Sequence, residues 1–590
     1  MRSRRLVSLL ALCLFVGVTV LLLRKPDSLS SILSHSEPPS SSDLKKPLPP
    51  ADAKSHPIRH LLTGAEVEFS RVLFRQSKTL KEAVAEYKRR YKIPPPPNFD
   101  KWYEFAKAKG VQLIDEYDTI HHSLIPFWAL EPAVIRGRAK EALGFKNALI
   151  GVLIRDGAVL NTAGGDEWQV DATIEMLKDF IQYLPDMDLA FNWHDEPRVI
   201  LSHDDLTRLV QKATDEALPD AFANPSPKNS FSPRPKDLED GKRFPEVFTT
   251  RFNVFAHQAT WTHSRISCPP SSPARSLSET PPDNTTAYTF SPLSFINNKT
   301  AFSDICLSPS LRQTFGFFDR PNAFDIVHDL FPIFSQSKIS SYQDILYPSP
   351  WYWADKVPYK ESQDYTWENK EDKMYWRGST TGGFSRDGGW RRQHRQRIVQ
   401  KINALDTTQI YQNETVGQEL EWHVKNVSKV DYKPLFDVYF SSVGQCDQGD
   451  CDAQKEFFRI VPGAAQRHAW AYKYLLDIDG NAFSGRFYAF LKSRSLIFKM
   501  AIFREWHEEW LKPWVHYIPL GMGGEEYVEA VRYFDREEEG RIQAVRVAEA
   551  GREWAEKVLR NADLEVWFFR LLLEYGRVVD DARGSIGFSL

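Results

Sequence analysis

Arginines beside small, flexible residues are the part of this sequence best suited to bind an anion. An apolar run ends at Asp479, and the short loop after it contains Gly480, Ser484 and Gly485 and closes with Arg486. Glycine lets a ligand approach the backbone closely, and a guanidinium group forms paired hydrogen bonds to phosphate oxygens. The loop is typical of a site for a phosphate-bearing ligand. Ordinary α/β packing with a surface arginine is the alternative interpretation.

A second loop of the same kind lies earlier in the chain. It reads Arg377-Gly378-Ser379-Thr-Thr-Gly-Gly and is followed by arginines at 386, 391, 392, 395 and 397. Three or four of these arginines are expected to form a solvated helix face whatever the function. If the two loops follow neighbouring strands, they converge on one anionic site.

A carboxylate at a strand end is the candidate proton acceptor. The run 187–192 reads as one buried strand, and His194, Asp195 and Glu196 follow it immediately before Pro197. A carboxylate in that place can take a proton from an attacking hydroxyl, as general-base catalysis requires. A turn or helix cap before proline is the alternative, and spacing alone favours it.

Three Asp-x-Asp pairs, at 186–188, 450–452 and 477–479, have the spacing found in metal-dependent sugar transferases. One such pair supplies fewer oxygen ligands than a divalent cation needs, and the pattern is common by chance. We therefore expect no metal at any of them.

Alternating strands and helices must position these residues. Short apolar runs at 373–377, 435–440, 472–479 and from 496 read as strands, whereas 390–405 and 525–581 read as helical. Helical segments also alternate with apolar runs between 113 and 350. The chain is too long for one small core, so two domains in an α/β fold are expected.

The amino terminus reads as a membrane anchor. Residues 1–5 form a basic tail, and 6–23 are an uncharged, mostly apolar run near the minimum length for spanning a bilayer. A single-pass anchor with a cytoplasmic amino terminus is expected, and a cleaved secretion signal is the alternative. Residues 24–98 read as a stem that includes one helix, from the capping-box spacing Thr63 to Glu66 as far as Tyr91.

Composition and cysteine usage point to the secretory pathway. The net charge is −3 with no dense basic stripe, which gives no support for nucleic-acid binding. The four cysteines after the apolar run are consistent with two disulfides, most simply Cys268–Cys306 and Cys446–Cys451. Glycosylation sequons occur at Asn284, Asn298, Asn413 and Asn426.

Several motifs together resemble glycosyltransferase family 90, which includes fungal capsule-associated β-1,2-xylosyltransferases and animal protein O-glucosyltransferases. The resemblance rests on Tyr375-Trp-Arg-Gly-Ser379, on Asp479-Gly-x-x-x-Ser-x-Arg-Phe487, on Leu511-Lys-Pro-Trp-Val-His-Tyr-Ile-Pro519 and on the segment 338–348. It runs from about residue 91 to the carboxyl terminus, and 514–519 is its most specific part.

The resemblance implies a GT-B fold, in which two Rossmann-like domains face a cleft. The acceptor domain would span 99–355, the nucleotide-sugar domain 356–524, and terminal helices 525–590. It also implies inverting, metal-independent transfer with Asp195 as the base. Arg377, Gly378 and Ser379 would line the nucleotide site, and Arg395 and Arg486 would hold the diphosphate beside Ser484. Arg391 or Arg392 could take the place of Arg395.

We therefore expect a Golgi or other secretory-pathway type II membrane enzyme with a luminal catalytic domain. It would transfer a sugar, with xylose as first choice, from a UDP-sugar to a hydroxyl of a glycan or glycoprotein, with no metal or other cofactor. A glycoside hydrolase is one rival; it would need a second carboxylate across the site and no arginine loops. A non-catalytic glycan-binding protein is the other.

Overall fold

The computed structural model describes residues 54–417 and 419–590. The expected cytoplasmic tail, anchor and first part of the stem lie outside these residues. Among the helices in the described ranges, none is both long enough and apolar enough to cross a membrane.

Two helices open the described part, where one was expected. They are α2 (Pro57–Phe74) and α3 (Leu80–Tyr91). The first begins before Thr63, because Pro57 stands in its first turn and His56 caps it by accepting from the Ile58 N–H. The true capping box is Thr79 with Glu82, at the start of the second helix. Both helices pack into the hydrophobic core, so the folded part begins well before residue 99.

The first sheet is mixed, with the order β2-β1-β3-β8-β9. Its strands are β1 (Leu149–Arg155), β2 (Ala158–Ala163), β3 (Met187–Asn192), β8 (Ile333–Ser335) and β9 (Ile345–Leu346). Only β3, β8 and β9 run parallel, whereas β1 is antiparallel to both of its neighbours. The turn Asp156-Gly157 has positive φ at both residues, the geometry of a tight hairpin, and this explains the antiparallel β1–β2 pair. The half is thus α/β but departs from the all-parallel Rossmann-like sheet that was expected.

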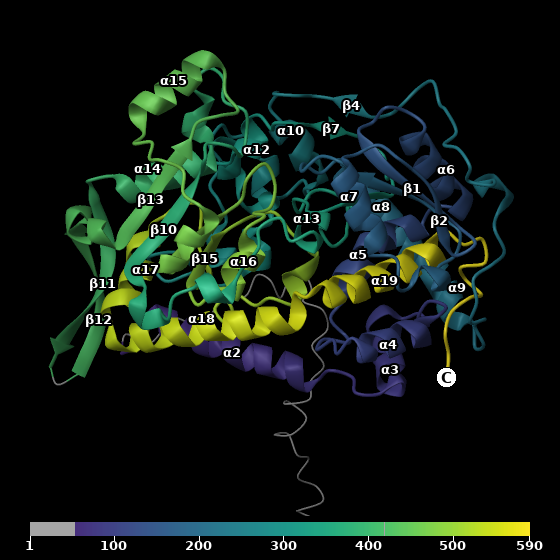
Figure 1. The fold of residues 1–590 in the computed structure, drawn as a ribbon, viewed down its shortest axis with the longest axis horizontal. Helices are drawn as coiled ribbons and strands as arrows, with labels where there is room; N and C mark the ends of the chain where they lie inside the picture. Colours follow the sequence, from purple (N-terminus) through teal and green to yellow (C-terminus); the bar gives the residue numbers. More distant parts are fainter. Residues whose placement is uncertain (1–53, 418) are drawn as a thin grey trace, which may run out of the picture. The chain divides into compact units, whose positions relative to one another are not determined.

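Helices and irregular segments precede this sheet and connect its strands (Figure 1). The helices are α4 (Phe99–Ala108), α5 (Asp118–Trp128), α6 (Pro132–Leu143), α7 (Glu167–Glu175), α8 (His203–Lys212), α9 (Leu218–Ala223), α10 (Trp261–Ser264), α11 (Lys299–Phe302) and α12 (Gly316–Asp319). Of these, α12 lies beside the second half. The long connection from β3 to β8 also contains two short pairs, β4 (Asn253–Val254) with β7 (Asp325–Ile326) and β5 (Thr289–Phe290) with β6 (Phe295–Ile296).

The second sheet is entirely parallel, with the order β13-β10-β14-β15-β16. Its strands are β10 (Glu371–Ser379), β13 (Phe436–Ser442), β14 (Tyr472–Ile478), β15 (Leu496–Met500) and β16 (Ile518–Pro519). The helices α14 (His394–Asn403), α15 (Gln448–Phe457) and α16 (Phe487–Lys492) lie in its connections. The strands expected at 373–377, 435–440, 472–479 and from 496 are confirmed. A hairpin, β11 (Thr407–Val416) with β12 (Glu419–Ser428), was not expected.

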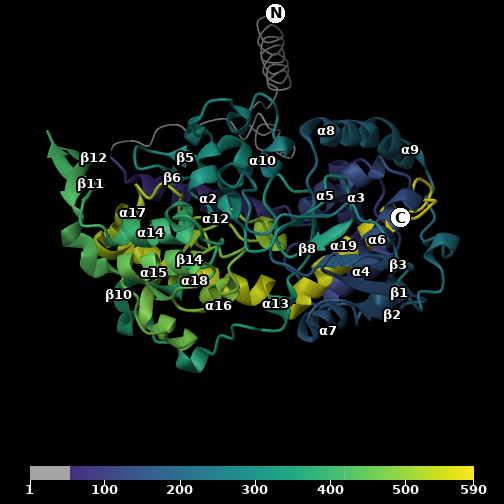
Figure 2. The ribbon, with the colours of Figure 1, turned by 90° about the horizontal axis from the view of Figure 1, so that it is seen from above.

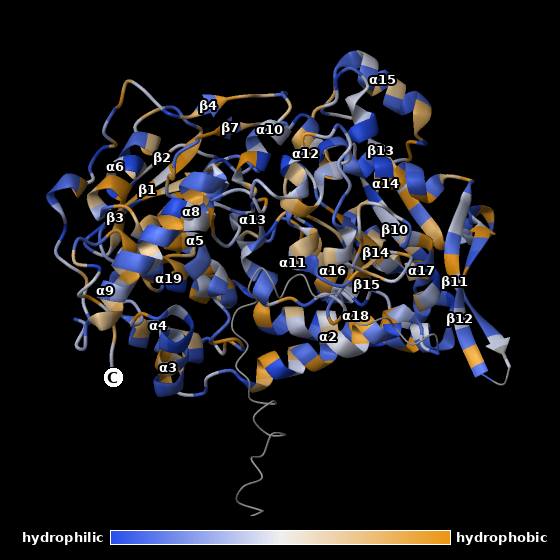
Figure 3. Ribbon diagram, turned by 180° about the vertical axis from the view of Figure 1, so that it is seen from behind, coloured by the Kyte–Doolittle hydropathy of each residue, from blue (hydrophilic) through white to orange (hydrophobic). Residues whose placement is uncertain are grey.

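The chain passes between the two halves after β9 and again near its carboxyl end. The first crossing follows β9 and contains the short helix α13 (Pro350–Trp353). The second lies between α18 (Glu538–Val558) and α19 (Asn561–Val578), which continue from α17 (Tyr527–Arg536). Helix α18 contacts β15 and α16, and α19 contacts α4 and α5 (Figure 1, Figure 2). Hydrophobic and hydrophilic residues alternate along α18 (Figure 3), as on a helix with one buried face, and nearly all of α19 is buried. The helical carboxyl terminus is confirmed.

Candidate active site

The two Gly/Arg loops meet at the carboxyl edge of the parallel sheet. Strands β10 and β14 are neighbours, and the strand order reverses between them. Open parallel sheets bind ligands at such a switch point. The loops also touch directly, because the Gly382 N–H donates to the Asn481 side-chain oxygen at 3.2 Å. The convergence predicted from sequence is therefore present.

Arg395 joins both loops from the first turn of α14. Its Nε donates to the Asp479 carbonyl at 2.8 Å, and its Nη1 donates to the Ser379 carbonyl at 3.2 Å and to the Thr381 hydroxyl at 2.8 Å. Burial, followed by the nearby charge of Arg486, lowers the pKa of Arg395 to about 9. It has no carboxylate partner within hydrogen-bond or ion-pair distance in the part of the chain that the structure describes.

Arg486 reaches the same corner from the other loop. Its Nη1 donates to the Arg377 carbonyl at 2.6 Å, and its guanidinium lies over the rings of Trp376 and Phe490. Burial lowers the pKa of Arg486, and the charge of Asp477 partly opposes that effect. Like Arg395, it forms no ion pair with any described carboxylate. Two neighbouring guanidinium groups with no carboxylate in ion-pair contact are typical of an anion site.

The other arginines near the first loop are occupied elsewhere. The Arg377 guanidinium pairs with Asp437 at 2.7 Å, so Arg377 contributes its backbone carbonyl to the corner. Arg392 pairs with Asp319 at 2.9 Å, and Arg391 is exposed over the Trp390 ring. Of the three alternatives left open by the sequence, Arg395 is the one in contact with both loops.

Small residues complete the first loop. A Cβ atom at Gly378 would lie 2.5 Å from the Trp376 ring, so only glycine fits there without a shift. The Ser379 hydroxyl is 2.9 Å from that of Thr381. In the second loop, the buried Ser484 hydroxyl donates to Asp477 and so faces the strand.

The three Asp-x-Asp pairs have protein partners. Asp477 pairs with Lys499 at 2.8 Å, and Asp479 accepts from the Ile502 N–H at 2.8 Å. Burial raises the pKa of Asp479 to about 6. The other two pairs are held as follows: Asp188 by Arg155, Asp186 by Arg234, Asp450 by Ser385 and Gly388, and Asp452 by Gln448 and Lys455. These carboxylates are therefore engaged in structural contacts within the protein.

Asp195 lies just beyond the end of β3 at the carboxyl edge of the first sheet. It is exposed, and no hydrogen bond or ion pair engages its carboxylate within the described ranges. Surrounding protein nevertheless raises the pKa of Asp195 by removing water from it. The buried neighbour Glu196 has a pKa raised to about 8, chiefly by burial and then by the charge of Asp195.

The segment 315–324, which contains the short helix α12, connects the Asp195 turn with the first Gly/Arg loop. Glu196 accepts from the Ala323 N–H at 3.0 Å, and the Arg320 carbonyl accepts from the Phe384 N–H at 2.6 Å. A Cβ atom at Gly316 would lie 2.0 Å from the Gly382 carbonyl, so these two backbones touch. Asp195 makes no direct contact with Arg395 or Arg486. Sequence reasoning missed this segment because its contacts are long-range.

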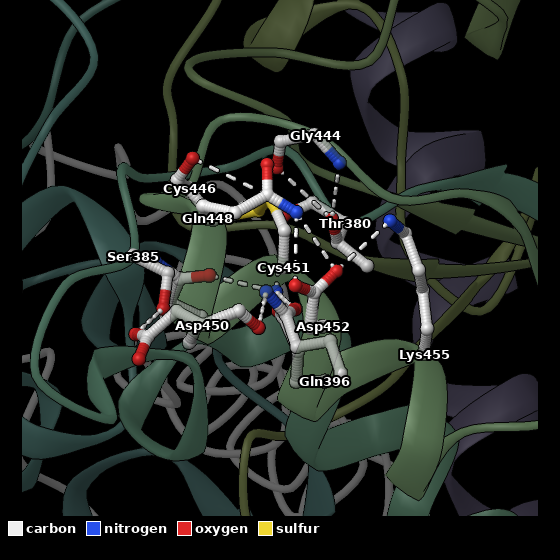
Figure 4. Close-up of a disulfide and its surroundings, with 12 residues drawn as sticks. Thr380, Ser385, Gln396, Gly444, Cys446, Gln448, Asp450, Cys451, Asp452 and Lys455 are labelled. Atoms are coloured by element: carbon white, nitrogen blue, oxygen red, sulfur yellow. Dashed lines mark hydrogen bonds and ion pairs between the residues drawn. A yellow bond between two sulfur atoms is a disulfide. The ribbon is translucent and has the colours of Figure 1, made fainter.

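Both expected disulfides are present, Cys268–Cys306 and Cys446–Cys451. The second braces the first Gly/Arg loop (Figure 4). The Thr380 hydroxyl donates to the Gly444 carbonyl at 3.0 Å, and the Ser385 hydroxyl donates to Asp450 at 2.6 Å. Of the four sequons, Asn413 and Asn426 are exposed on the β11–β12 hairpin, and the Asn298 side chain caps α11. Their glycosylation stays a prediction.

Residues 317–581 match the family model described as Glycosyl transferase family 90. Over these residues the chain is similar to glycosyltransferase family 90. The match includes both Gly/Arg loops and excludes Asp195.

Curated relatives agree with this assignment. The chain is 27% identical to the O-glucosyltransferase rumi homolog of Aedes aegypti over 42% of this chain and 56% of that protein. It is 25% identical to O-glucosyltransferase rumi of Drosophila melanogaster (42% and 55%) and 23% identical to protein O-glucosyltransferase 1 of Homo sapiens (46% and 63%). The chain thus spans little more than half the length of these relatives.

Proposed function

We propose that this chain is an inverting glycosyltransferase that moves a sugar from a UDP-sugar to a hydroxyl of a glycan or glycoprotein. The observation that carries the proposal is the pair Arg395 and Arg486. Both guanidinium groups lie at the ends of adjacent parallel strands, and neither has a described carboxylate partner. A diphosphate supplies the missing negative charge and accepts paired hydrogen bonds from guanidinium groups.

The chemistry follows from where charge develops. An acceptor oxygen attacks the anomeric carbon from the face opposite UDP, the bond to the diphosphate oxygen breaks, and the sugar passes through an oxocarbenium-like state. The departing diphosphate gains negative charge. Fixed cations at Arg395 and Arg486 stabilise that charge more in the transition state than in the bound substrate, without a metal.

Asp195 is the proposed base that takes the acceptor proton. Its carboxylate is exposed and unpaired, so an incoming hydroxyl can reach it. Its raised pKa makes it a stronger base than a fully solvated aspartate. Glu196, with a pKa of about 8, is protonated at neutral pH and adds no competing charge beside it.

Donor, acceptor and compartment belong to the same proposal. Xylose is the first choice of donor sugar, and glucose is the second candidate because the relatives are named O-glucosyltransferases. Two disulfides and the sequons support a secretory-pathway lumen, with a Golgi type II orientation proposed from the amino-terminal sequence.

The test is a panel of UDP-sugars incubated with the purified full chain and candidate glycan acceptors, in excess EDTA, with UDP release as the readout. Release with at least one donor, dependent on acceptor, is expected. Binding of UDP without release from any donor would favour the glycan-binding rival. Cleavage of a glycan without a nucleotide donor would favour the hydrolase, and a strict need for added manganese would contradict the metal-free mechanism.

A further inference from the structure

The short helix α13 holds the second Gly/Arg loop, residues 479–486, by its backbone. The Tyr352 hydroxyl donates to the Ser484 carbonyl at 2.8 Å, and the Trp351 indole N–H donates to the Gly485 carbonyl at 3.1 Å. Trp351 lies so close that a Cβ atom at Gly485 would be 2.5 Å from its indole nitrogen. The Ser484 carbonyl also accepts from the Phe487 N–H at 3.2 Å. Two consecutive side chains of α13 thus hold two consecutive carbonyls of the loop.

Packing fixes these two side chains in turn. Tyr352 is buried and stacks on Tyr488 of α16, with ring centroids 3.6 Å apart and parallel planes. The next residue, Trp353, donates its indole N–H to Glu175 of α7 at 3.1 Å. Helix α13 thus joins the loop of the second half to a helix of the first half.

Fixing the carbonyls also orients the N–H groups that follow them. In a trans peptide the carbonyl and the next N–H point in opposite directions. With the Ser484 and Gly485 carbonyls turned toward α13, the N–H groups of Gly485 and Arg486 point away from it. Neither N–H has a hydrogen-bond partner among the described residues, and both belong to the loop that presents the Arg486 guanidinium.

We infer that Trp351 and Tyr352 are positioning residues for the nucleotide-sugar site, an inference that rests on the proposed function. They hold the loop so that two backbone N–H groups and the Arg486 side chain face the diphosphate together. They contact no substrate themselves. Because α13 lies in the crossing between the sheets and is anchored on α7, the affinity for UDP depends on the contact between the two halves.

The test compares conservative variants by calorimetric titration with UDP. Tyr352→Phe and Trp351→Phe each remove one hydrogen bond and keep an aromatic ring. Each is expected to weaken UDP binding about fivefold, with donor KM raised to match and kcat changed less. Tyr359→Phe is the matched control, since it removes the hydrogen bond from another tyrosine of the same crossing, to Asp364, and leaves the loop untouched.

Further variants separate this role from general stability. The buried Glu505 also interacts with the Tyr352 hydroxyl, and Glu505→Gln is expected to bind UDP as the wild type does. Tyr359→Phe is expected to lose as much thermal stability as Tyr352→Phe and to keep its UDP affinity. UDP affinity within twofold of wild type in both Tyr352→Phe and Trp351→Phe would overturn this inference and leave the proposed function standing. Failure of the wild type to bind UDP would instead overturn the proposed function.

Discussion

The two sheets of this protein differ in regularity, and the difference decides how each contributes to the site. In the second half, parallel strands alternate with helices, so the residues at the ends of β10 and β14 meet at one edge. In the first half, an antiparallel hairpin and the long connection from β3 to β8 interrupt that pattern. The regular half holds the arginine corner that is proposed to bind the donor, whereas the irregular half presents the candidate base and the segment 315–324 that contacts the first Gly/Arg loop.

The largest effect is expected for a variant of the first half that lowers turnover and leaves donor binding in the second half unchanged. Asp195→Asn is expected to lower kcat about 1,000-fold because it removes the proton acceptor, while the dissociation constant for UDP stays within twofold. Steady-state kinetics and calorimetry measure the two quantities. Asp329→Asn, an aspartate at the surface of the same half, is the control. Wild-type turnover in Asp195→Asn would contradict the assignment of the catalytic base to Asp195 in the first half.

Within the second half, an unpaired and a paired arginine of the corner, Arg486 and Arg377, should differ in their effect on donor binding. Arg486→Ala removes an unpaired guanidinium and is expected to raise the donor KM about 30-fold. Arg377→Ala breaks a pair with Asp437 that lies beside the corner and is expected to raise the donor KM less than threefold. Equal effects of the two variants would show that the unpaired state of Arg486 has no bearing on donor binding.

Each half has one disulfide, and removing each in turn tests how the two halves differ in stability and in UDP binding. On a chain-entropy estimate, the 38-residue separation of Cys268–Cys306 is worth about 4 kcal/mol and the 5-residue separation of Cys446–Cys451 about 2 kcal/mol. Double serine variants should lose unfolding free energy in that order. Only the second pair should also weaken UDP binding, since its loop braces Thr380 and Ser385. A change in UDP affinity from the first pair alone would reverse this assignment.

The smallest effect concerns a buried carboxyl of the second half, Glu526. Burial raises its pKa to about 7, so the folded chain keeps a proton that the unfolded chain releases above about pH 4.5. Its contribution to the unfolding free energy is therefore full in acid and falls as the pH rises to about 7. Glu526→Gln cannot ionise, and its melting temperature should rise relative to wild type between pH 5 and pH 8. A difference independent of pH would contradict the raised pKa.

Local patterns in the sequence predicted the second half well. Apolar runs separated by glycine loops located β10, β14 and β15, and the close spacing of Cys446 and Cys451 predicted their pairing. The hairpin at Asp156-Gly157 was not predicted, although an Asp-Gly pair is a strong signal for a tight turn. The start of α2 was misplaced because Pro57 was not weighed as a first-turn residue. Contacts such as Trp351 with Gly485 join residues far apart in the chain, and no local pattern encodes them.

The central claim is that Arg395 and Arg486 bind the diphosphate of a nucleotide sugar without a metal. The most direct measurement is calorimetric titration of the wild type and of Arg395→Ala/Arg486→Ala, in EDTA, with UDP and with uridine. The account predicts that the double variant loses most of its affinity for UDP and binds uridine, which has no phosphate, as the wild type does. Equal affinity of both proteins for UDP, or absence of UDP binding by the wild type, would contradict it.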